Sequence, residues 1–278
     1  MFHFWLDGHD MQIIEADGVE VEPFSVTDFP VAVAQRYSVL VTAKNETNTN
    51  YVMHALMDPQ MFDVVPEDLV LDIEATISYG ADNERSPSIS KDPEELPFFQ
   101  DMDLVPVEKI SQAPADISIE MKFAFDTYDN GVNRAAFNGI TYQSPKVPSI
   151  FTQISAGDNS SVATTYGAQT QAYVINHMDM VELNIINTDA GQHPFHLHGH
   201  KFQLVHRSFD VESDDPAINP PVEEGQANPF QRDTLMIPPG GSTRIRFRAD
   251  NPGAWIFHCH MFVALPLSLS LLLPSLID

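Results

Sequence analysis

Histidine and cysteine gather in two short segments of this 278-residue chain, residues 193–200 (HPFHLHGH) and 258–260 (HCH). The chain has 11 histidines, and its only cysteine stands in the second segment. Two such clusters favour metal binding over a histidine-rich loop with a buried core cysteine. Paired cysteines, which are typical of structural zinc sites, are absent, and so is the H-E-x-x-H motif of zinc proteases. Imidazoles with a single thiolate indicate copper, as in electron-transfer sites with two histidines and one cysteine.

The spacing of these residues predicts two separate ligand sets. Successive side chains of a β-strand point to opposite faces, so we expect His196 and His198 to lie on one face. By the same rule, His258 and His260 share a face and Cys259 points to the other. One short strand would therefore contribute a thiolate to one metal site and two imidazoles to another.

The two motifs HPFHLHGH (193–200) and PGAWIFHCH (252–260) together resemble the C-terminal domain of the multicopper oxidases. In that family His200 is not a ligand. The resemblance implies these copper ligands: for type 1, His193 and Cys259; for type 2, His196; for type 3, His198, His258 and His260. It also implies a reaction in which type 1 copper takes single electrons from a substrate. Cys259 would pass them to its neighbouring histidines and so to the trinuclear cluster, where dioxygen becomes water.

Two acidic residues narrow the resemblance to the fungal iron-uptake ferroxidases. Asp189 stands in D-A-G-Q-H-P-F-H and Asp63 in D-V-V-P, as in that group. Segments such as AQRYSVLVTAKN and FNGITYQSPKVP are similar as well. The resemblance implies that both carboxylates bind ferrous iron and help carry its electron, with ferrous iron and dioxygen as substrates. Carboxylate oxygens stabilise the ferric product more than the ferrous reactant. A laccase-type phenol oxidase with the same coppers is the alternative.

The chain departs from the family pattern at the end of the second motif. Ala264 stands where the family has the last type 1 histidine, and no histidine follows His260. The family's first domain, which supplies four further histidines of the trinuclear cluster, has no counterpart here. We therefore expect weak or absent copper at the type 1 site and, as a further alternative, a non-catalytic fragment with a partial metal site. A gene-model error after His260 would explain the change.

Short apolar alternating segments separated by turns predict the elements that position these residues. Examples are 117–125, 180–187, 201–207, 242–249 and 254–260. The pattern predicts an all-β chain of antiparallel Greek-key sandwich type, and the resemblance makes it cupredoxin-like. We expect three parts with an atypical tail: 1–80, the C-terminal part of domain 2; 81–112, a linker; 113–278, domain 3, with the tail at 261–278. Loss of the family's final strand would leave an open sheet edge.

Composition bears on partners and on location. Lys and Arg number 14 against 39 Asp and Glu, a net charge of −25, which argues against nucleic acid and anionic membranes. The apolar tail contains Pro266 and Pro274, so we expect no transmembrane segment there. Sequons at Asn45 and Asn159 favour a glycoprotein that is secreted or lies at the extracellular face of the plasma membrane. The resembling ferroxidases work beside an iron permease, which is the partner that we expect.

Overall fold

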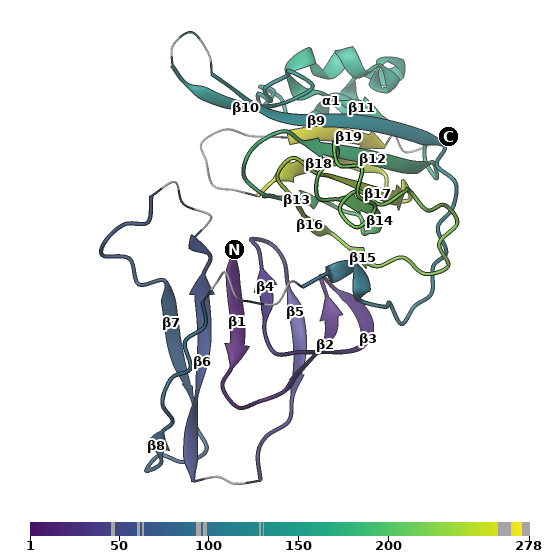
Figure 1. Ribbon diagram of the computed structural model, residues 1–278. Helices are drawn as coiled ribbons and strands as arrows, with labels where there is room; N and C mark the ends of the chain where they lie inside the picture. Colours follow the sequence, from purple (N-terminus) through teal and green to yellow (C-terminus); the bar gives the residue numbers. More distant parts are fainter. Residues whose placement is uncertain are drawn as a thin grey trace. The chain divides into compact units, whose positions relative to one another are not determined.

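The chain forms two compact units, Met1–Glu108 and Lys109–Asp278 (Figure 1). A computed structural model describes residues 1–45, 48–59, 62, 64–92, 96, 99–127, 129, 131–260 and 268–273. In the segment expected to be a linker, Ser86 N–H donates to the Asn50 carbonyl, and Val107 N–H donates to the Glu20 carbonyl. This segment therefore runs along the first unit.

The described part of the first unit contains two sheets and one short 3-10 helix. One sheet has the order β4-β1-β6-β7, with β8 paired to β6, and the other has the order β3-β2-β5. The elements are β1 (Phe2–Leu6), β2 (Met11–Ala16), β3 (Val19–Val26), β4 (Phe29–Val31), β5 (Tyr37–Val41), β6 (Thr49–Met57), β7 (Asp72–Ile77), β8 (Glu84–Arg85) and η3 (Asp101–Asp103). Along β6, every second residue is buried, as expected for a strand with one covered face.

The second unit also has two sheets, with the orders β10-β9-β12-β17-β14-β15 and β11-β19-β18-β13-β16. Most neighbours are antiparallel, whereas β9 runs parallel to β12 and β11 parallel to β19. The strands are β9 (Ile117–Thr127), β10 (Asn133–Phe137), β11 (Tyr173–Val174), β12 (Met180–Asn187), β13 (His193–Leu197), β14 (Phe202–Ser208), β15 (Gln231–Arg232), β16 (Thr234–Ile237), β17 (Ser242–Arg248), β18 (Gly253–Cys259) and β19 (Ser268–Leu273).

Aromatic side chains join the two sheets of the second unit. Phe195 and Phe257 belong to one sheet, and their ring centroids lie 5.4 Å apart. From the other sheet, Phe137 and Phe123 approach Phe195 with centroid distances of 5.4 and 5.7 Å. All four side chains are buried. The second unit is therefore a β-sandwich, as the strand pattern predicts.

Between β10 and β11 the chain forms short helices that the alternation of apolar residues did not predict. They are α1 (Ser149–Ser155), η4 (Gly157–Ser161), η5 (Ala163–Tyr166) and η6 (Ala168–Thr170). Helices of seven residues or fewer are too short for a periodic apolar face to stand out. None of the residues of α1 is buried, which removes the signal altogether.

The expectation of an open edge beside β18 is wrong. Ser268–Leu273 forms β19, which pairs antiparallel with β18 and parallel with β11. A leucine-rich segment can supply this strand because backbone groups, not a particular side-chain sequence, make the ladder. Within the described ranges, no helix is long and apolar enough to cross a membrane.

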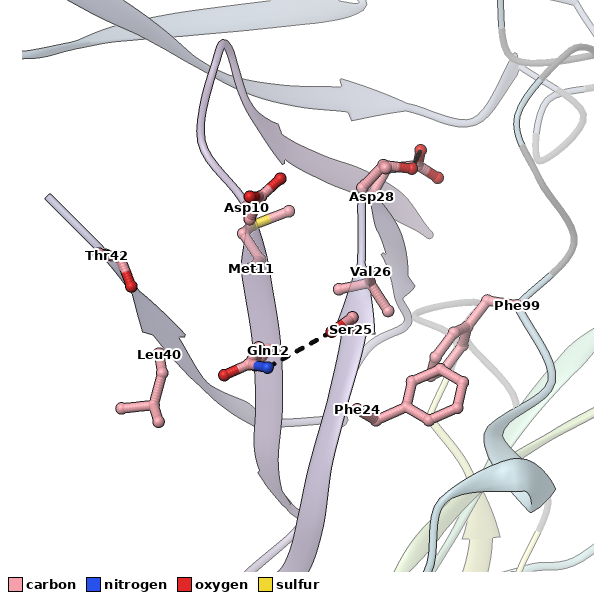
Figure 2. Close-up of a pocket in the computed structure, with 11 residues that line it drawn as sticks. Asp10, Met11, Gln12, Phe24, Ser25, Val26, Asp28, Leu40, Thr42 and Phe99 are labelled. Atoms are coloured by element: carbon pink, nitrogen blue, oxygen red, sulfur yellow. Dashed lines mark hydrogen bonds between the residues drawn. The ribbon is translucent and has the colours of Figure 1, made fainter. Parts of the chain in front are cut away.

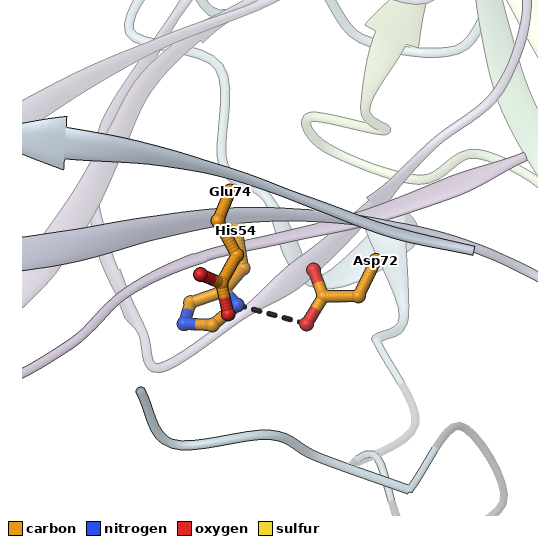
Figure 3. A group of neighbouring side chains, drawn as sticks. All are labelled: His54, Asp72 and Glu74. Atoms are coloured by element: carbon orange, nitrogen blue, oxygen red, sulfur yellow. Dashed lines mark hydrogen bonds and ion pairs between the residues drawn. The ribbon is translucent and has the colours of Figure 1, made fainter. Parts of the chain in front are cut away.

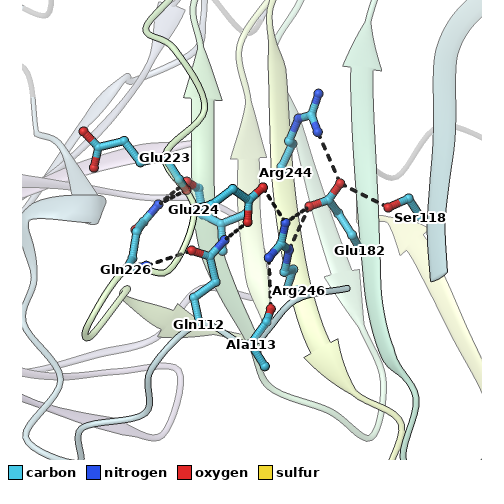
Figure 4. A network of polar contacts seen from close by, with 10 residues as sticks. Gln112, Ala113, Ser118, Glu182, Glu223, Glu224, Gln226, Arg244 and Arg246 are labelled. Atoms are coloured by element: carbon cyan, nitrogen blue, oxygen red, sulfur yellow. Dashed lines mark hydrogen bonds and ion pairs between the residues drawn. The ribbon is translucent and has the colours of Figure 1, made fainter. Parts of the chain in front are cut away.

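A polar network holds the long 208–231 segment against the larger sheet (Figure 4). Arg246 donates from Nε to Glu182 at 2.8 Å and from a terminal nitrogen to Glu224 at 2.8 Å. Gln112 and Gln226 bond to each other through backbone and side chain. Arg246 and Glu182 are nearly fully buried, so each charge depends on the other for compensation.

Candidate metal centre

The neighbouring strands β13 and β18 bring the two sequence motifs together. They pair antiparallel, with His196 opposite His258 and Phe195 opposite Cys259. Directly opposed residues of an antiparallel pair point to the same face. The strand pairing therefore separates the imidazoles from the thiol, as the spacing of the motifs predicts.

Four imidazoles form a cluster on one face. The ring of His196 lies 4.9 Å from that of His198 and 5.9 Å from those of both His258 and His260, measured between centroids. His258 and His260 are 5.0 Å apart. The closest approach joins the Nε2 atoms of His198 and His258, at 3.0 Å. We refer to these four residues as the imidazole cluster.

Cys259 faces the opposite way, toward His193. Its Sγ lies 3.8 Å from Nδ1 of His193. The other ring nitrogen, Nε2, donates to the Asp189 carboxylate at 2.9 Å. His193 is buried, and its ring packs edge-on against Phe123 at 4.4 Å. Asp189, His193 and Cys259 thus form a line of three contacting side chains, all in the second unit.

The turn between β13 and β14 requires the glycine of the first motif, because a side chain there would be strained and would collide with its neighbours. Gly199 has a φ of +72°, and a Cβ at this position would approach the ring of Trp255 to 2.6 Å. Trp255 donates its indole N–H to the Asn251 carbonyl at 2.7 Å, and Asn251 donates to the Gly199 carbonyl at 3.0 Å. These contacts fix the backbone next to His198. His200 lies outside the cluster, where its ring packs 5.2 Å from Phe247.

Hydrogen bonds fix the tautomers of two cluster members. Nδ1–H of His196 donates to the Asp233 carbonyl at 3.0 Å, with the Thr234 hydroxyl equally near. Nδ1–H of His258 donates to the Cys259 carbonyl at 3.0 Å. A ring that donates from Nδ1 and carries no second proton keeps the Nε2 lone pair for a metal. Asp233 and Thr234 had no predicted role. The only signal for them is the resemblance of the segment QRDT to the ferroxidases.

Burial favours the neutral form of three of these histidines, His258, His198 and His193. The pKa of His258 falls to about 4, because burial and, to a smaller extent, the neighbouring histidines lower it against a hydrogen bond to the Cys259 carbonyl that raises it. Burial also lowers the pKa of His198 below its usual value, again with help from neighbouring histidines. At His193 burial lowers the pKa, although the Asp189 carboxylate opposes this effect. Neutral imidazole is the form that binds metal.

The donor set fits copper. Metal–nitrogen and metal–sulfur bonds of about 2.0 and 2.3 Å, the lengths seen for zinc, place the two ligand atoms roughly 3.5–3.8 Å apart at angles of about 110–120°. The Cys259 Sγ to His193 Nδ1 distance of 3.8 Å agrees with this separation. Several neutral imidazoles in one cluster are likewise ligands that copper prefers.

The loop around Asp189 is held by its own backbone. Asp189 N–H donates to the Asn187 side chain at 2.9 Å, and Gly191 N–H donates to the Asp189 carboxylate at 3.0 Å. The carboxylate is about one-third exposed, so it touches both His193 and solvent. Asp63 and Ala264, the other two positions singled out in the sequence, lie outside the described residues.

A hollow in the first unit is separate from these ligands (Figure 2). It has a volume of about 550 Å³ and is lined by residues of β2, β3 and β5 together with Phe99. Gln12 donates to Ser25 across it at 3.4 Å. No histidine or cysteine is among its described lining residues. Its described lining residues therefore lack the imidazole and thiol donors that make up the metal centre.

Comparisons with known proteins agree with this geometry. Family models described as multicopper oxidase match residues 1–76 and 141–266. An iron multicopper oxidase of Mycosarcoma maydis is 52% identical over 261 residues, which are 94% of this chain and 42% of the relative. An iron transport multicopper oxidase of Kluyveromyces lactis is 40% identical over 280 residues, covering 98% and 44%. The chain thus spans less than half the length of these curated relatives.

Solved structures give the same picture. The crystal structure of Fet3p, a multicopper oxidase that functions in iron import, matches with a TM-score of 0.87 and 36% identity, covering 97% of this chain and 53% of that one. A laccase from Botrytis aclada matches with a TM-score of 0.78 at 21% identity, covering 98% and 49%. The second likeness supports the fold alone. Together with the strand pairing, these matches confirm the predicted cupredoxin-type all-β fold.

Proposed function

This chain belongs to the multicopper oxidase family, and on that premise we propose that it carries the iron-oxidising end of a ferroxidase. The reaction is the oxidation of four ferrous ions coupled to the reduction of one dioxygen, with four protons, to two waters. The observation that carries the proposal is the contact between the Asp189 carboxylate and His193, whose ring faces Cys259. The relatives' roles in iron transport and iron import support the same substrate.

The residues that would hold copper form two sets. His193 and Cys259 would bind the type 1 ion, and the imidazole cluster would contribute type 2 and type 3 ligands. When bound, copper supplies the capacity to accept single electrons and to reduce dioxygen. Peptide bonds join Cys259 to His258 and His260, so a short covalent path connects the two ligand sets.

Asp189 has two tasks in this proposal. Its partly exposed carboxylate offers an oxygen ligand to ferrous iron. After oxidation, the ferric ion prefers such a carboxylate ligand to water. The same carboxylate accepts the Nε2–H hydrogen bond of His193, which fixes the tautomer and leaves Nδ1 directed at Cys259. An iron ion bound to Asp189 would therefore be connected to the His193 ring by a single hydrogen bond. Asp63 is the second proposed iron ligand.

The setting follows from the same proposal. A chain with 39 acidic and 14 basic residues attracts cations from solution, which suits an iron oxidase. We place the protein outside the cell or at the outer face of the plasma membrane, where an iron permease would take up the product. The exposed sequon residues Asn45 and Asn159 support an extracellular setting.

The test compares reductants. Oxygen uptake by the copper-loaded chain is measured with ferrous iron and with a substituted phenol, for the native protein and for Asp189→Asn. Asp210→Asn, a change in an exposed acid of the 208–231 segment, is the matched control. We expect iron to drive faster uptake than the phenol, and Asp189→Asn to slow the iron reaction selectively.

Three results would count against the proposal. Faster uptake with the phenol, together with an iron reaction indifferent to Asp189, would assign the chain to the laccase type. No uptake with either reductant, from protein that holds copper, would assign it to the non-catalytic class. Equal loss in Asp189→Asn and Asp210→Asn would also remove the specific role of Asp189.

A further inference from the structure

A second group of metal-binding side chains lies in the first unit, on three adjacent strands. Trp5 of β1 is opposite His54 of β6, and His54 is opposite Glu74 of β7. Opposed residues share a face, and Asp72 lies on the same face of β7 as Glu74. One ligand atom each from His54, Asp72 and Glu74 lies within 4.8 Å of the others (Figure 3).

The imidazole of His54 is held on all sides. Its side chain is fully buried, and the ring stacks on Trp5 with centroids 4.3 Å apart and planes 8° from parallel. Nε2 lies 3.3 Å from the Asp7 carboxylate, and Nδ1 lies 3.0 Å from the Asp72 carboxylate. Asp7 is itself buried and accepts a hydrogen bond from Ile89 N–H at 3.0 Å. The ring orientation is therefore fixed.

In its neutral form, the His54 ring cannot donate a hydrogen bond to both of the carboxylates beside it. A neutral imidazole has a single N–H, so it can donate to Asp7 or to Asp72 but not to both. With the proton on Nε2 toward the buried Asp7, the Nδ1 lone pair points at a carboxylate oxygen 3.0 Å away. Asp72 Oδ1 is buried too and has no donor among the described residues. Lone pairs facing each other require a positive charge between them, which a second ring proton or a metal ion can supply.

We propose that His54, Asp72 and Glu74 bind a divalent cation in the first unit, separate from the copper ligands. Nδ1 of His54 and one oxygen from each carboxylate are the ligands, and Asp7 is the outer partner that fixes the tautomer. A histidine ligand donates its other N–H to a carboxylate in many protein metal sites. The side chains of Asp72 and Glu74 are 21% and 33% exposed, which gives an ion access from solvent.

The donor set selects the class of ion. One imidazole with two carboxylates suits zinc or ferrous iron, and it lacks the thiolate that copper(I) favours. Calcium and magnesium prefer all-oxygen sites. Glu74 now pairs with Arg85 and accepts from Ser88, so ion binding would draw it away from those partners. Zinc is the practical probe because it needs no protection from oxidation.

The experiment measures zinc stoichiometry by equilibrium dialysis at pH 7. The full chain carries His196→Ala, His258→Ala and Cys259→Ser, so that neither ligand set of the second unit masks the result. In this background we expect one bound zinc. Asp72→Asn and Glu74→Gln should each weaken it at least about tenfold. Glu84→Gln, at an exposed acid on β8, is the matched control and should bind as the background does. Circular dichroism confirms that each variant is folded.

The outcomes separate clearly. Zinc bound by the background and by Glu84→Gln, but lost in Asp72→Asn and Glu74→Gln, supports the site. Equal binding in all four proteins overturns it. No zinc in the background also overturns it, because a proton would then bridge His54 and Asp72 instead. If Asp72→Asn does not fold, Glu74→Gln decides, since its side chain is the more exposed of the two carboxylates.

Discussion

Asp189 accepts a hydrogen bond from Nε2 of His193 at 2.9 Å. The opposite nitrogen of this ring faces the thiol of Cys259 at 3.8 Å. A carboxylate in this position orients a ligand ring and raises its basicity. The same acid also reaches solvent, so an ion from outside and the buried ligand pair meet at a single side chain.

The first prediction concerns this orienting contact. Asp189→Ala removes the acceptor of His193, so we expect affinity for copper(I) at the His193 and Cys259 pair to fall by about 10–100-fold. The measurement is a competition titration with a chromophoric chelator. The part of the binding that Cys259→Ser abolishes defines the site. Asp210→Ala is the control and should leave this part unchanged, whereas a loss equal to that of Asp189→Ala would refute the contact's role.

A second prediction concerns the independence of the two ligand sets. Cys259 points away from the imidazole cluster, so Cys259→Ser should leave copper(II) binding by the cluster intact. His198→Ala removes the nitrogen that lies 3.0 Å from His258 and should lower that binding by at least about tenfold. Electron paramagnetic resonance of copper(II) titrations reports both results. His177→Ala, a change at an exposed position, is the control. Equal losses of copper(II) binding in Cys259→Ser and His198→Ala would mean that the two ligand sets do not bind copper independently.

The strands and the separation of the ligands were predictable because both follow from the two-residue period of a strand. His196, His198, His258 and His260 do share one side, and Cys259 faces His193 on the other. The apolar alternation of β9, β12 and β17 is equally local. Such features depend on residues that stand next to each other in the chain, and a single sequence displays them directly.

Other features depend on contacts between distant segments. Asp233, between β15 and β16, holds His196 from 37 residues away, and no local pattern marks it. β19 pairs with β18 through backbone hydrogen bonds, which do not require the side chains that the family has at these positions. The leucine-rich sequence therefore predicts a lost strand where the structure has one. The His54 and Asp72 pair likewise arises from strand order, since 18 residues separate them in the chain.

Acid should weaken the metal-free protein through its buried imidazoles. The folded-state pKa of His258 is about 4, below the value near 6.5 of an unfolded chain. As pH falls, the unfolded state takes up a proton first. The stability that the neutral ring contributes is therefore fully present above pH 6.5 and is lost as pH falls toward 4. His198 and His193 shift in the same direction and add to the effect.

Urea unfolding of chelator-treated protein at several pH values between 7.5 and 4 measures this loss. His258→Gln cannot take up the proton, so its free energy of unfolding should fall less steeply over this range than that of the native chain. His177→Gln, at an exposed site, should follow the native slope. Parallel curves for the native protein and His258→Gln would contradict the assignment.

The aromatic core predicts a large loss on truncation. Phe195 is fully buried and contacts rings from both sheets. Phe195→Ala removes the apolar surface and leaves a cavity, so we expect a loss of about 3–5 kcal/mol in the free energy of unfolding. Phe151, which is 60% exposed, is the matched control, and its alanine variant should change stability by less than about 0.5 kcal/mol. Similar losses in both variants would mean that the interior of the sandwich is not packed around Phe195.

The last prediction separates a buried ion pair from a partly exposed cation on the same strand. Arg246 and Glu182 have side chains only 5% exposed each, and Arg246 also bonds the Ala113 carbonyl and Glu224 (Figure 4). Arg246→Ala leaves the Glu182 carboxylate buried with less compensation, since only Arg244 at 3.2 Å and the Ser118 hydroxyl at 3.4 Å still reach it among the described residues. We expect a loss of about 3–5 kcal/mol in the free energy of unfolding, measured in urea.

Arg248 is the matched control for this pair, because it lies on the same strand, is partly exposed and donates to the Met178 carbonyl rather than to a buried carboxylate. Arg248→Ala should cost less than about 1 kcal/mol. Glu182→Gln in the Arg246→Ala background should recover part of the loss, since a neutral amide is cheaper to bury than a carboxylate. No recovery in the double variant would show that the loss comes from packing of the arginine stem, because removing the buried charge would then have made no difference.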